Sequence, residues 1–155
     1  MVRANGHTVG NESSGTAGAL PAAVRECDYY LSHIRQVETV EALMGDARLY
    51  DFVMTAHGLE DMAYARSFIR RLLVGGLDGP GALAIRFSDS RYSALLAAFN
   101  FALHGTSTTS RRAALEGVVT RYLRRAEEKA SRARLVPPSA LRAIRPHHRI
   151  RLGGR

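Results

Sequence analysis

Apolar residues between positions 21 and 130 recur at spacings of three and four, which places them on one face of an α-helix. The pattern predicts helical segments at residues 22–36, 39–44, 46–57, 60–74, 82–87, 90–104 and 111–130. No stretch alternates apolar and polar residues for long enough to predict a strand. The sequence therefore predicts an all-α fold, a compact bundle of about six or seven short to medium helices.

The apolar face of each segment predicts which side chains are buried. The first segment, which Pro21 is well placed to open, has an apolar stripe made of Val24, Cys27, Leu31 and Ile34. In segment 90–104 the corresponding residues are Leu95, Leu96, Phe99 and Leu103. We expect the centre of the core to be formed by Phe52, Ile69, Leu95, Phe99 and Val119, buried together.

Gly58 interrupts an apolar pattern that resumes on both sides of it. A glycine just after a helix commonly adopts the left-handed conformation that ends the helix, so we interpret Gly58 as a helix boundary. Asp46 and Asp89 precede apolar segments and are expected to be N-caps. The acidic pair Glu60-Asp61 is expected in the first turn of the following helix, where the helix dipole favours negative charge.

Two stretches resemble each other, residues 42–58 and 82–105. Both contain a short helical segment, an aspartate cap, an Asp-x-Arg, an aromatic residue, an apolar helix and a final His-Gly. Chance use of good caps is one explanation of this weak repeat. The other is a pair of related helical hairpins around a shared core, followed by a terminal helix.

Charge and composition divide the chain into three parts. Residues 1–20 are rich in Gly, Ser, Asn and Thr and are expected to be disordered. Residues 21–130 form the helical domain, and residues 131–155 an Arg-rich, disordered tail. The net charge is +8, yet residues 1–129 carry 15 Lys and Arg against 14 Asp and Glu. Residues 130–155 carry seven Arg and no acid, so we assign the basic character to the tail.

The sequence offers little catalytic chemistry. Cys27 is the only cysteine, which excludes an internal disulfide, and we interpret it as an apolar filler. Neighbouring helical residues point about 100° apart, so Glu60 and Asp61 do not form a carboxylate dyad. His57 is expected to be structural, since the end of a helix favours it. The sequence therefore predicts no enzyme and no catalytic, cofactor-binding or metal site.

Other polar motifs do not indicate a metal, phosphate or catalytic site either. His147 and His148 are adjacent in the tail without acidic neighbours, and a metal needs ligands that converge from a rigid frame. The glycines at 75–76 and in 78–81 lack the Lys-Ser/Thr of a phosphate loop. Residues Ser107 to Ser110 are typical of turns and caps. No apolar run is long enough to span a bilayer, and the N-terminus lacks the apolar centre of a signal peptide.

Three runs, 26–34, 46–73 and 88–109, resemble the domain of unknown function 1217 family. The resemblance covers roughly residues 22–129, and the block Gly-Leu-Glu-Asp-Met-x-Tyr-Ala with the later Phe-Asn-Phe is its most specific part. It implies a helical, flagellum-associated or adaptor-like protein of alphaproteobacteria, with no established catalytic residues. His57 departs from the family, whose members usually carry an aromatic residue there. The resemblance is expected to stop after Ala130.

Three interpretations of the tail remain open. It is an arm that binds nucleic acid or an acidic partner through its Arg side chains, a disordered end, or the product of a shifted reading frame. We favour the shifted frame, because GC-rich codons read out of frame yield Arg, Ala, Pro and Gly. The tail is then dispensable for folding.

Together these features predict a non-enzymatic helical interaction domain of a flagellum-associated protein, with protein partners that include flagellar components. We expect it to be cytoplasmic or associated with the bacterial flagellum, and not inserted in a membrane. The alternative function is binding of nucleic acid or an acidic partner through the Arg-rich tail. A third class, a small-ligand binder or enzyme in the helical core, would require a polar pocket.

Overall fold

The computed structural model describes residues 19–76 and 89–135, and every regular element in these two ranges is helical. The α-helices are α2 (Ala19–His33), α3 (Val40–Gly45), α4 (Ala47–Ala56), α5 (Arg66–Gly75), α7 (Ser90–Ala98), α8 (Phe101–His104) and α9 (Val118–Leu135). Shorter turns are η1 (Ile34–Gln36), η2 (Glu60–Met62), η3 (Gly105–Ser110) and η4 (Ala113–Gly117). The all-α prediction is confirmed.

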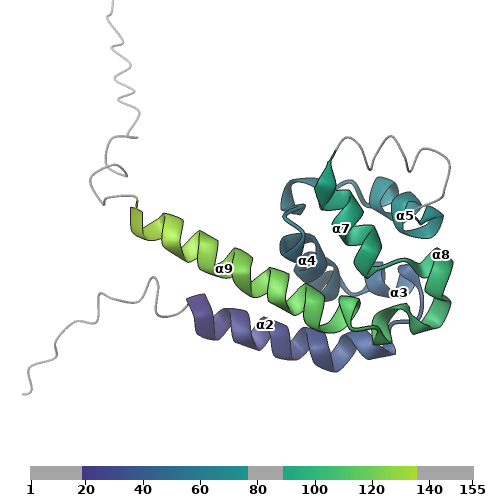
Figure 1. Cartoon of the computed structure of the whole chain (residues 1–155), viewed down its shortest axis with the longest axis horizontal. Helices are drawn as coiled ribbons and strands as arrows, with labels where there is room; N and C mark the ends of the chain where they lie inside the picture. The colour runs from purple at the N-terminus through teal and green to yellow at the C-terminus, as the bar shows by residue number, and fades with distance from the viewer. Residues whose placement is uncertain (1–18, 77–88, 136–155) are drawn as a thin grey trace, which may run out of the picture.

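Helices α2 and α9 run side by side in opposite directions (Figure 1). α9 also packs along α4, which connects this pair to a body made of α3, α4, α5, α7 and α8. The C-terminal half of α9 extends from the body as an arm, with the start of α2 beside it (Figure 1). Contact between α4 and α9 therefore joins the α2–α9 pair to the body.

One apolar core joins the elements. Phe52, Ile69, Leu95 and Phe99 are buried in it as expected, whereas Val119 is only partly buried and packs against its edge. Three aromatic rings cross the junction of α2, α4 and α9: Phe52 stacks on Tyr30 at a centroid distance of 4.4 Å and on Tyr122 at 4.0 Å. Stacked pairs of this kind each contribute about 0.5–1.5 kcal/mol beyond burial.

The buried face of α2 differs from the expected one. Cys27 and Ile34 are buried, but Val24 and Leu31 are 52% and 39% exposed, so their predicted burial is wrong. Tyr30 is fully buried instead, and its hydroxyl donates to the Ala114 carbonyl at 2.5 Å. Positions 24 and 31 lie beside the buried stripe, so periodicity alone could not separate the two faces.

Both aspartate caps are confirmed. The Asp46 carboxylate accepts hydrogen bonds from the backbone N–H groups of Arg48 and Leu49, each at 3.0 Å. The Asp89 carboxylate accepts from the backbone N–H of Arg91 at 2.9 Å. Gly58 ends the α4 segment with φ +67°, the left-handed conformation that the sequence predicts.

The helix expected at 60–74 is interrupted. Residues Glu60–Met62 form the 3₁₀ turn η2, and α5 begins only at Arg66. Backbone bonds three residues apart, such as Ala63 N–H to the Glu60 carbonyl, replace the α-helical ones, and the Tyr50 hydroxyl donates to the Ala63 carbonyl at 2.9 Å. The acidic pair lies in the first turn of η2, the helical element that follows Gly58, and not at the start of α5.

The helix expected at 90–104 also breaks. α7 ends at Ala98, and α8 starts at Phe101 with the Asn100 side chain accepting from the Leu103 N–H at 3.1 Å. Leu103 is 71% exposed, contrary to its expected burial. Gly76, with φ +64°, approaches this break so closely that a Cβ would lie 2.9 Å from the Asn100 side-chain oxygen. Packing against α5 thus decides where α7 ends.

The last regular segment of the described residues starts as the π-helical turn η4 and continues as α9 to Leu135, past the expected end at residue 130. Residues 131–135 are therefore helical, and disorder is wrong for this part of the predicted tail. The expected helix 82–87, and with it the start of the second repeat, lies outside the described residues. So do residues 1–18 of the disordered segment expected at 1–20, and most of the predicted tail, from residue 136 onward. Residues 19 and 20 belong to α2, so disorder is wrong for these two positions.

Candidate interaction surface on helix α9

An open depression lies on the outer surface where η4 passes into α9. It measures about 570 Å³ and is lined chiefly by Arg112, Glu116, Gly117, Thr120, Arg121 and Arg124. These residues recur about every fourth position, so they share one side of the helix. We call this surface the arginine groove.

The π-helical turn shapes one end of the groove. The Gly117 N–H bonds to the Arg112 carbonyl five residues earlier, at 3.1 Å, and adds one residue to the turn. π-turns inside α-helices are rare and frequently occur at functional sites. Here the turn is anchored from the inner side by the Tyr30 hydroxyl on the Ala114 carbonyl. The core therefore holds the backbone from which Arg112 and Glu116 project.

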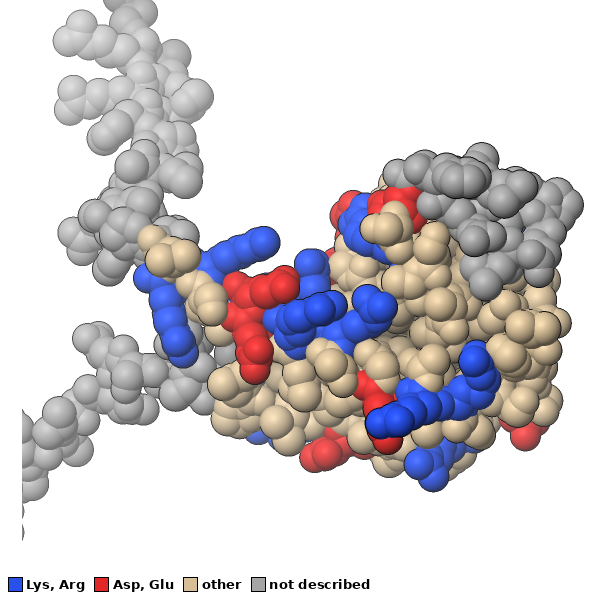
Figure 2. Space-filling view, viewed as in Figure 1, with Lys and Arg blue, Asp and Glu red and all other residues tan. Residues whose placement is uncertain are grey.

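The arginines of the groove differ in their partners. Arg112 pairs with Glu116 at 2.6 Å, but both side chains are largely exposed, so this pair stabilises little. Arg121 and Arg124 make no ion pair with any residue of the described ranges. Figure 2 shows basic side chains gathered over this helix. Two guanidinium groups three positions apart are thus available to a ligand that carries negative charge.

The basic surplus of this segment was missed by the charge balance. Residues 111–135 carry eight Lys and Arg against three Asp and Glu. The near-neutral count over residues 1–129 hides this concentration, because the acids are mostly in the first half of the chain. Most of the net charge of the chain still lies in residues 130–155, but α9 and the turn before it carry a local basic surplus as well. A charge count in windows of helix length would have found the segment.

A second charged cluster holds α9 to the body. The Glu60 carboxylate accepts from Lys129 Nζ at 2.8 Å and from the Arg125 guanidinium at 3.4 Å. Partial burial by itself raises the pKa of Glu60, but the hydrogen bond and charge of Lys129 outweigh it and hold that pKa below its ordinary value. Asp61 binds a different residue, Arg91, at 3.3 Å. The two acidic neighbours therefore serve separate contacts between elements.

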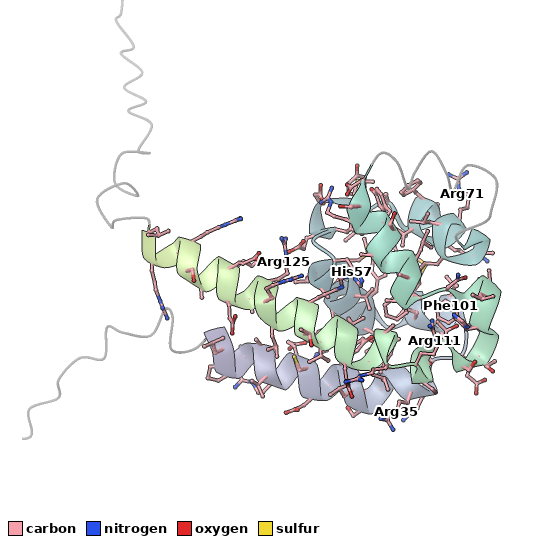
Figure 3. The ribbon with its side chains drawn as sticks, viewed as in Figure 1. Arg35, His57, Arg71, Phe101, Arg111 and Arg125 are labelled. Atoms are coloured by element: carbon pink, nitrogen blue, oxygen red, sulfur yellow. The ribbon has the colours of Figure 1, made fainter. Side chains whose placement is uncertain are left out.

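His57 lies behind this cluster, and Figure 3 shows Arg125 on α9 and His57 on the α4 side. Its Nδ1 is 2.8 Å from the Val53 carbonyl, and its Nε2 has no hydrogen-bond partner in the described residues. Burial lowers the pKa of His57 to about 4, and the nearby charge of Arg121 acts in the same direction. His57 is therefore a neutral core residue, edge-on to Phe99, at pH 7.

The other singled-out residues fill structural places. Cys27 is buried, and burial raises the pKa of its thiol, which makes it a poor nucleophile. Thr109 is fully buried and donates to the Val37 carbonyl at 2.6 Å, while the Ser107 hydroxyl donates to the His104 carbonyl at 2.7 Å. The turn chemistry expected for 107–110 is confirmed; the burial of Thr109 was not expected.

Metal and membrane chemistry have no support in the described ranges. They contain no group of three or more His, Cys, Asp and Glu side chains able to hold a metal ion. His147 and His148 lie outside them. Among the helices of residues 19–76 and 89–135, none is sufficiently long and apolar to cross a membrane.

Comparison with known proteins places this helical chain in a protein family. Residues 56–145 match the family described as Protein of unknown function (DUF1217), and the chain belongs to this family. A crystal structure of an Agrobacterium tumefaciens protein is similar, with 33% identity and a TM-score of 0.67 over 84% of this chain and 65% of that one. This chain therefore spans 65% of the length of that protein. No curated protein matches it significantly.

The family match corrects one expectation. It continues to residue 145, past Ala130, where the resemblance was expected to stop. α9 likewise continues through Leu135 with its helical bonding intact. Both observations argue against a change of reading frame at Ala130.

Proposed function

We propose that this protein is a non-enzymatic helical interaction domain that binds an acidic protein partner through the arginine groove. The observation that carries the proposal is the pair Arg121 and Arg124, which project from a rigid helix and have no ion-pair partner in the described residues. Arginine binds carboxylates in a two-pronged geometry, which makes it the preferred residue for such contacts.

The chemistry of the groove supports binding rather than catalysis. Its lining supplies guanidinium groups, one threonine hydroxyl and one glutamate that Arg112 already engages. A nucleophile needs an adjacent base to activate it. The polar side chains that line the groove with Thr120 are arginines and Glu116, and Glu116 accepts a hydrogen bond from Arg112. The open shape also leaves bound groups in contact with water, whereas catalytic electrostatics depend on water exclusion.

We further propose that the partner belongs to the flagellar system. This part rests on the resemblance read from the sequence and on membership of the family, whose match covers residues 56–145. A capture experiment with the purified chain against flagellar basal-body and export components tests it, together with the motility of a deletion strain. We expect a flagellar partner to be retained and swimming to be impaired. Normal swimming without a flagellar partner would contradict the association.

A charge reversal separates the groove from general basicity. Arg121→Glu with Arg124→Glu should abolish capture of the partner, since carboxylates would then face carboxylates. The matched control is Arg132→Glu with Arg134→Glu, which makes the same charge change farther along α9. Equal loss in both variants would show that net charge, not the groove, governs binding.

Nucleic-acid binding through the Arg-rich tail at 131–155 is the alternative. It predicts an affinity for generic duplex DNA that falls steeply with salt, because bound phosphates release counterions. Removal of residues 136–155 would then abolish DNA binding and leave acidic-partner binding unchanged. The groove variant would have the opposite effect.

A further inference from the structure

A cavity of about 410 Å³ lies where α2, α4 and α9 meet. It is open to solvent and falls within the size range of small-ligand pockets, about 300–1,000 Å³. Its chemistry comes from Glu26 of α2, from Arg48, Asp51, Phe52 and Thr55 of α4, and from Tyr122 of α9. Three elements therefore converge on one concave surface, which the arginine groove does not share.

The inner side of the cavity is aromatic. Phe52 is buried, and Tyr122 stacks on it at 4.0 Å with an interplanar angle of 14°. Tyr30 extends the stack on the other side of Phe52, so the rings have little freedom to move. Both faces of Phe52 are covered by the other two rings, so Phe52 offers only its edge to the cavity. The face of Tyr122 that does not stack on Phe52 is the one that can attract a cation within about 6 Å of its centroid.

The rim is acidic. Glu26 engages Arg48 through two hydrogen bonds of 2.9 Å, and the Arg48 guanidinium also lies 3.9 Å above the Tyr29 ring. Arg48 is therefore occupied by Glu26 and Tyr29, which reduces its repulsion of an incoming cation. Asp51 is exposed and makes no hydrogen bond or ion pair through its side chain with the rest of the described chain. Two carboxylates against one guanidinium leave the rim with a negative charge.

We propose that this cavity binds a cationic amino or guanidinium group on a short apolar stem. The stem packs against Phe52 and Tyr122, the cation pairs with Asp51, and the Thr55 hydroxyl supplies a further polar contact. Such a group comes either from a Lys or Arg side chain of a partner protein or from a free alkyl amine. The proposal goes beyond the acidic-partner function, because the charge of the ligand is the opposite one.

Two probes distinguish these sources. One is 1,4-diaminobutane, and the other is a short peptide with a single central lysine and blocked ends. Titration calorimetry with the full chain measures both, and butanol serves as the uncharged control. Saturable binding of either probe, and none of butanol, supports the cavity. Binding of the peptide alone identifies a protein side chain as the ligand, whereas binding of the diamine alone identifies a free amine.

Variants locate the site. Asp51→Asn should weaken probe binding by about threefold, the effect of losing one exposed charge pair. Tyr122→Leu should weaken it by about fivefold through loss of the aromatic face. Asp28→Asn, an exposed change on α2 that does not line the cavity, should bind as the wild type does. Tyr122→Phe keeps the ring and should bind as the wild type does. Normal binding by this variant would show that the aromatic ring, and not the hydroxyl, is what the probe needs.

Three results would overturn the proposal. They are absence of saturable binding by both probes, equal binding of butanol, and equal losses in Asp51→Asn and Asp28→Asn. None of them affects the arginine groove, since its residues are not in this cavity.

Discussion

His57 and Gly58 are neighbours at the end of α4, and each takes its role from what the fold places against it. His57 is 5% exposed, so its imidazole titrates under the influence of the core rather than of water. Gly58 lies beneath the Arg125 guanidinium, and a Cβ at this position would be 3.1 Å from Arg125 Cζ. The residue types alone show neither neighbour.

The buried His57 predicts a loss of stability in mild acid. The unfolded chain takes up a proton near pH 6.5, whereas the folded chain resists protonation until about pH 4. The unfolded state therefore binds more protons in this window, and stability falls as pH falls through it. The full effect is about 3 kcal/mol.

His57→Phe tests this effect, because phenylalanine fills a similar volume and cannot titrate. Urea unfolding of both proteins at pH 7.5, 6 and 5 should show the wild type losing stability relative to the variant as the pH falls. Parallel curves for the two proteins would mean that the imidazole is accessible to protons in the folded state.

Gly58→Val should lower the free energy of unfolding by at least about 1–2 kcal/mol, the cost of a left-handed conformation for a β-branched residue. Contact with Arg125 adds to this cost. Arg125→Ala in the Gly58→Val chain removes this contact, and Arg125→Ala in the wild type measures the separate cost of losing the Glu60 pair. Gly45→Ala is the control, because no atom lies within 4 Å of its Cβ position and its φ is not positive. A denaturation midpoint unchanged by Gly58→Val would contradict the left-handed cap.

At the scale of elements, helix starts follow local signals and helix interruptions follow packing. Asp46 and Asp89 cap their helices through bonds that span two or three residues. The break between α7 and α8 instead coincides with the close approach of Gly76 from α5. The apolar pattern continues on both sides of this break, so the pattern alone could not predict that Gly76 comes close to Asn100 there.

Asp46→Ala and Asp89→Ala should each cost about 0.5–2 kcal/mol of stability through loss of an N-cap. Asp46 should be the costlier of the two, since it accepts two backbone N–H bonds. Asp89 accepts one backbone N–H bond, and its other hydrogen bonds come from the Arg91 side chain. Thermal unfolding followed by circular dichroism measures both. Asp28→Ala, an exposed change within α2, is the control and should be nearly neutral. The reverse order of the two losses would show that the number of backbone N–H bonds accepted does not set the cost.

At the scale of the whole molecule, α9 belongs to both the arm and the body. Its first half packs on α4 and α2, while Lys129 and Arg125 reach Glu60 on the body. The Glu60 and Arg125 side chains are about one-third exposed, at 33% and 34%. Their attraction is therefore partly screened by water and salt.

Glu60→Gln should accordingly cost only about 0.5–1 kcal/mol at low salt. The difference from wild type should shrink as salt is added, because screening weakens the pairs that the variant lacks. Denaturant unfolding at two salt concentrations measures it. Glu127→Gln, an exposed change on α9 without an ion pair in the described residues, is the control. A salt-independent difference would assign the role of Glu60 to packing instead.

The sequence by itself determined the features whose causes are local. Spacings of three and four predicted the helical class, and the aspartates and Gly58 predicted where α4 and α7 begin and where the α4 segment ends. It also predicted most of the core centre, because Phe52, Ile69, Leu95 and Phe99 are large apolar residues in the middle of strongly periodic segments. Caps and periodicity act within a few residues, so a linear reading detects them.

Only the tertiary structure decided which of two adjacent faces each helix buries. On α2, Tyr30 faces the core and Val24 faces solvent. Tyr30 can be buried because its hydroxyl donates to the carbonyl of Ala114, a residue far along the chain. The arginine groove and the cavity beside Asp51 arise in the same way. The groove needs a π-turn anchored from the core, and the cavity needs three elements to converge. Contacts between residues distant in sequence leave no periodic signal in the sequence. The groove and the cavity therefore could not be predicted from it and are visible only in the folded structure.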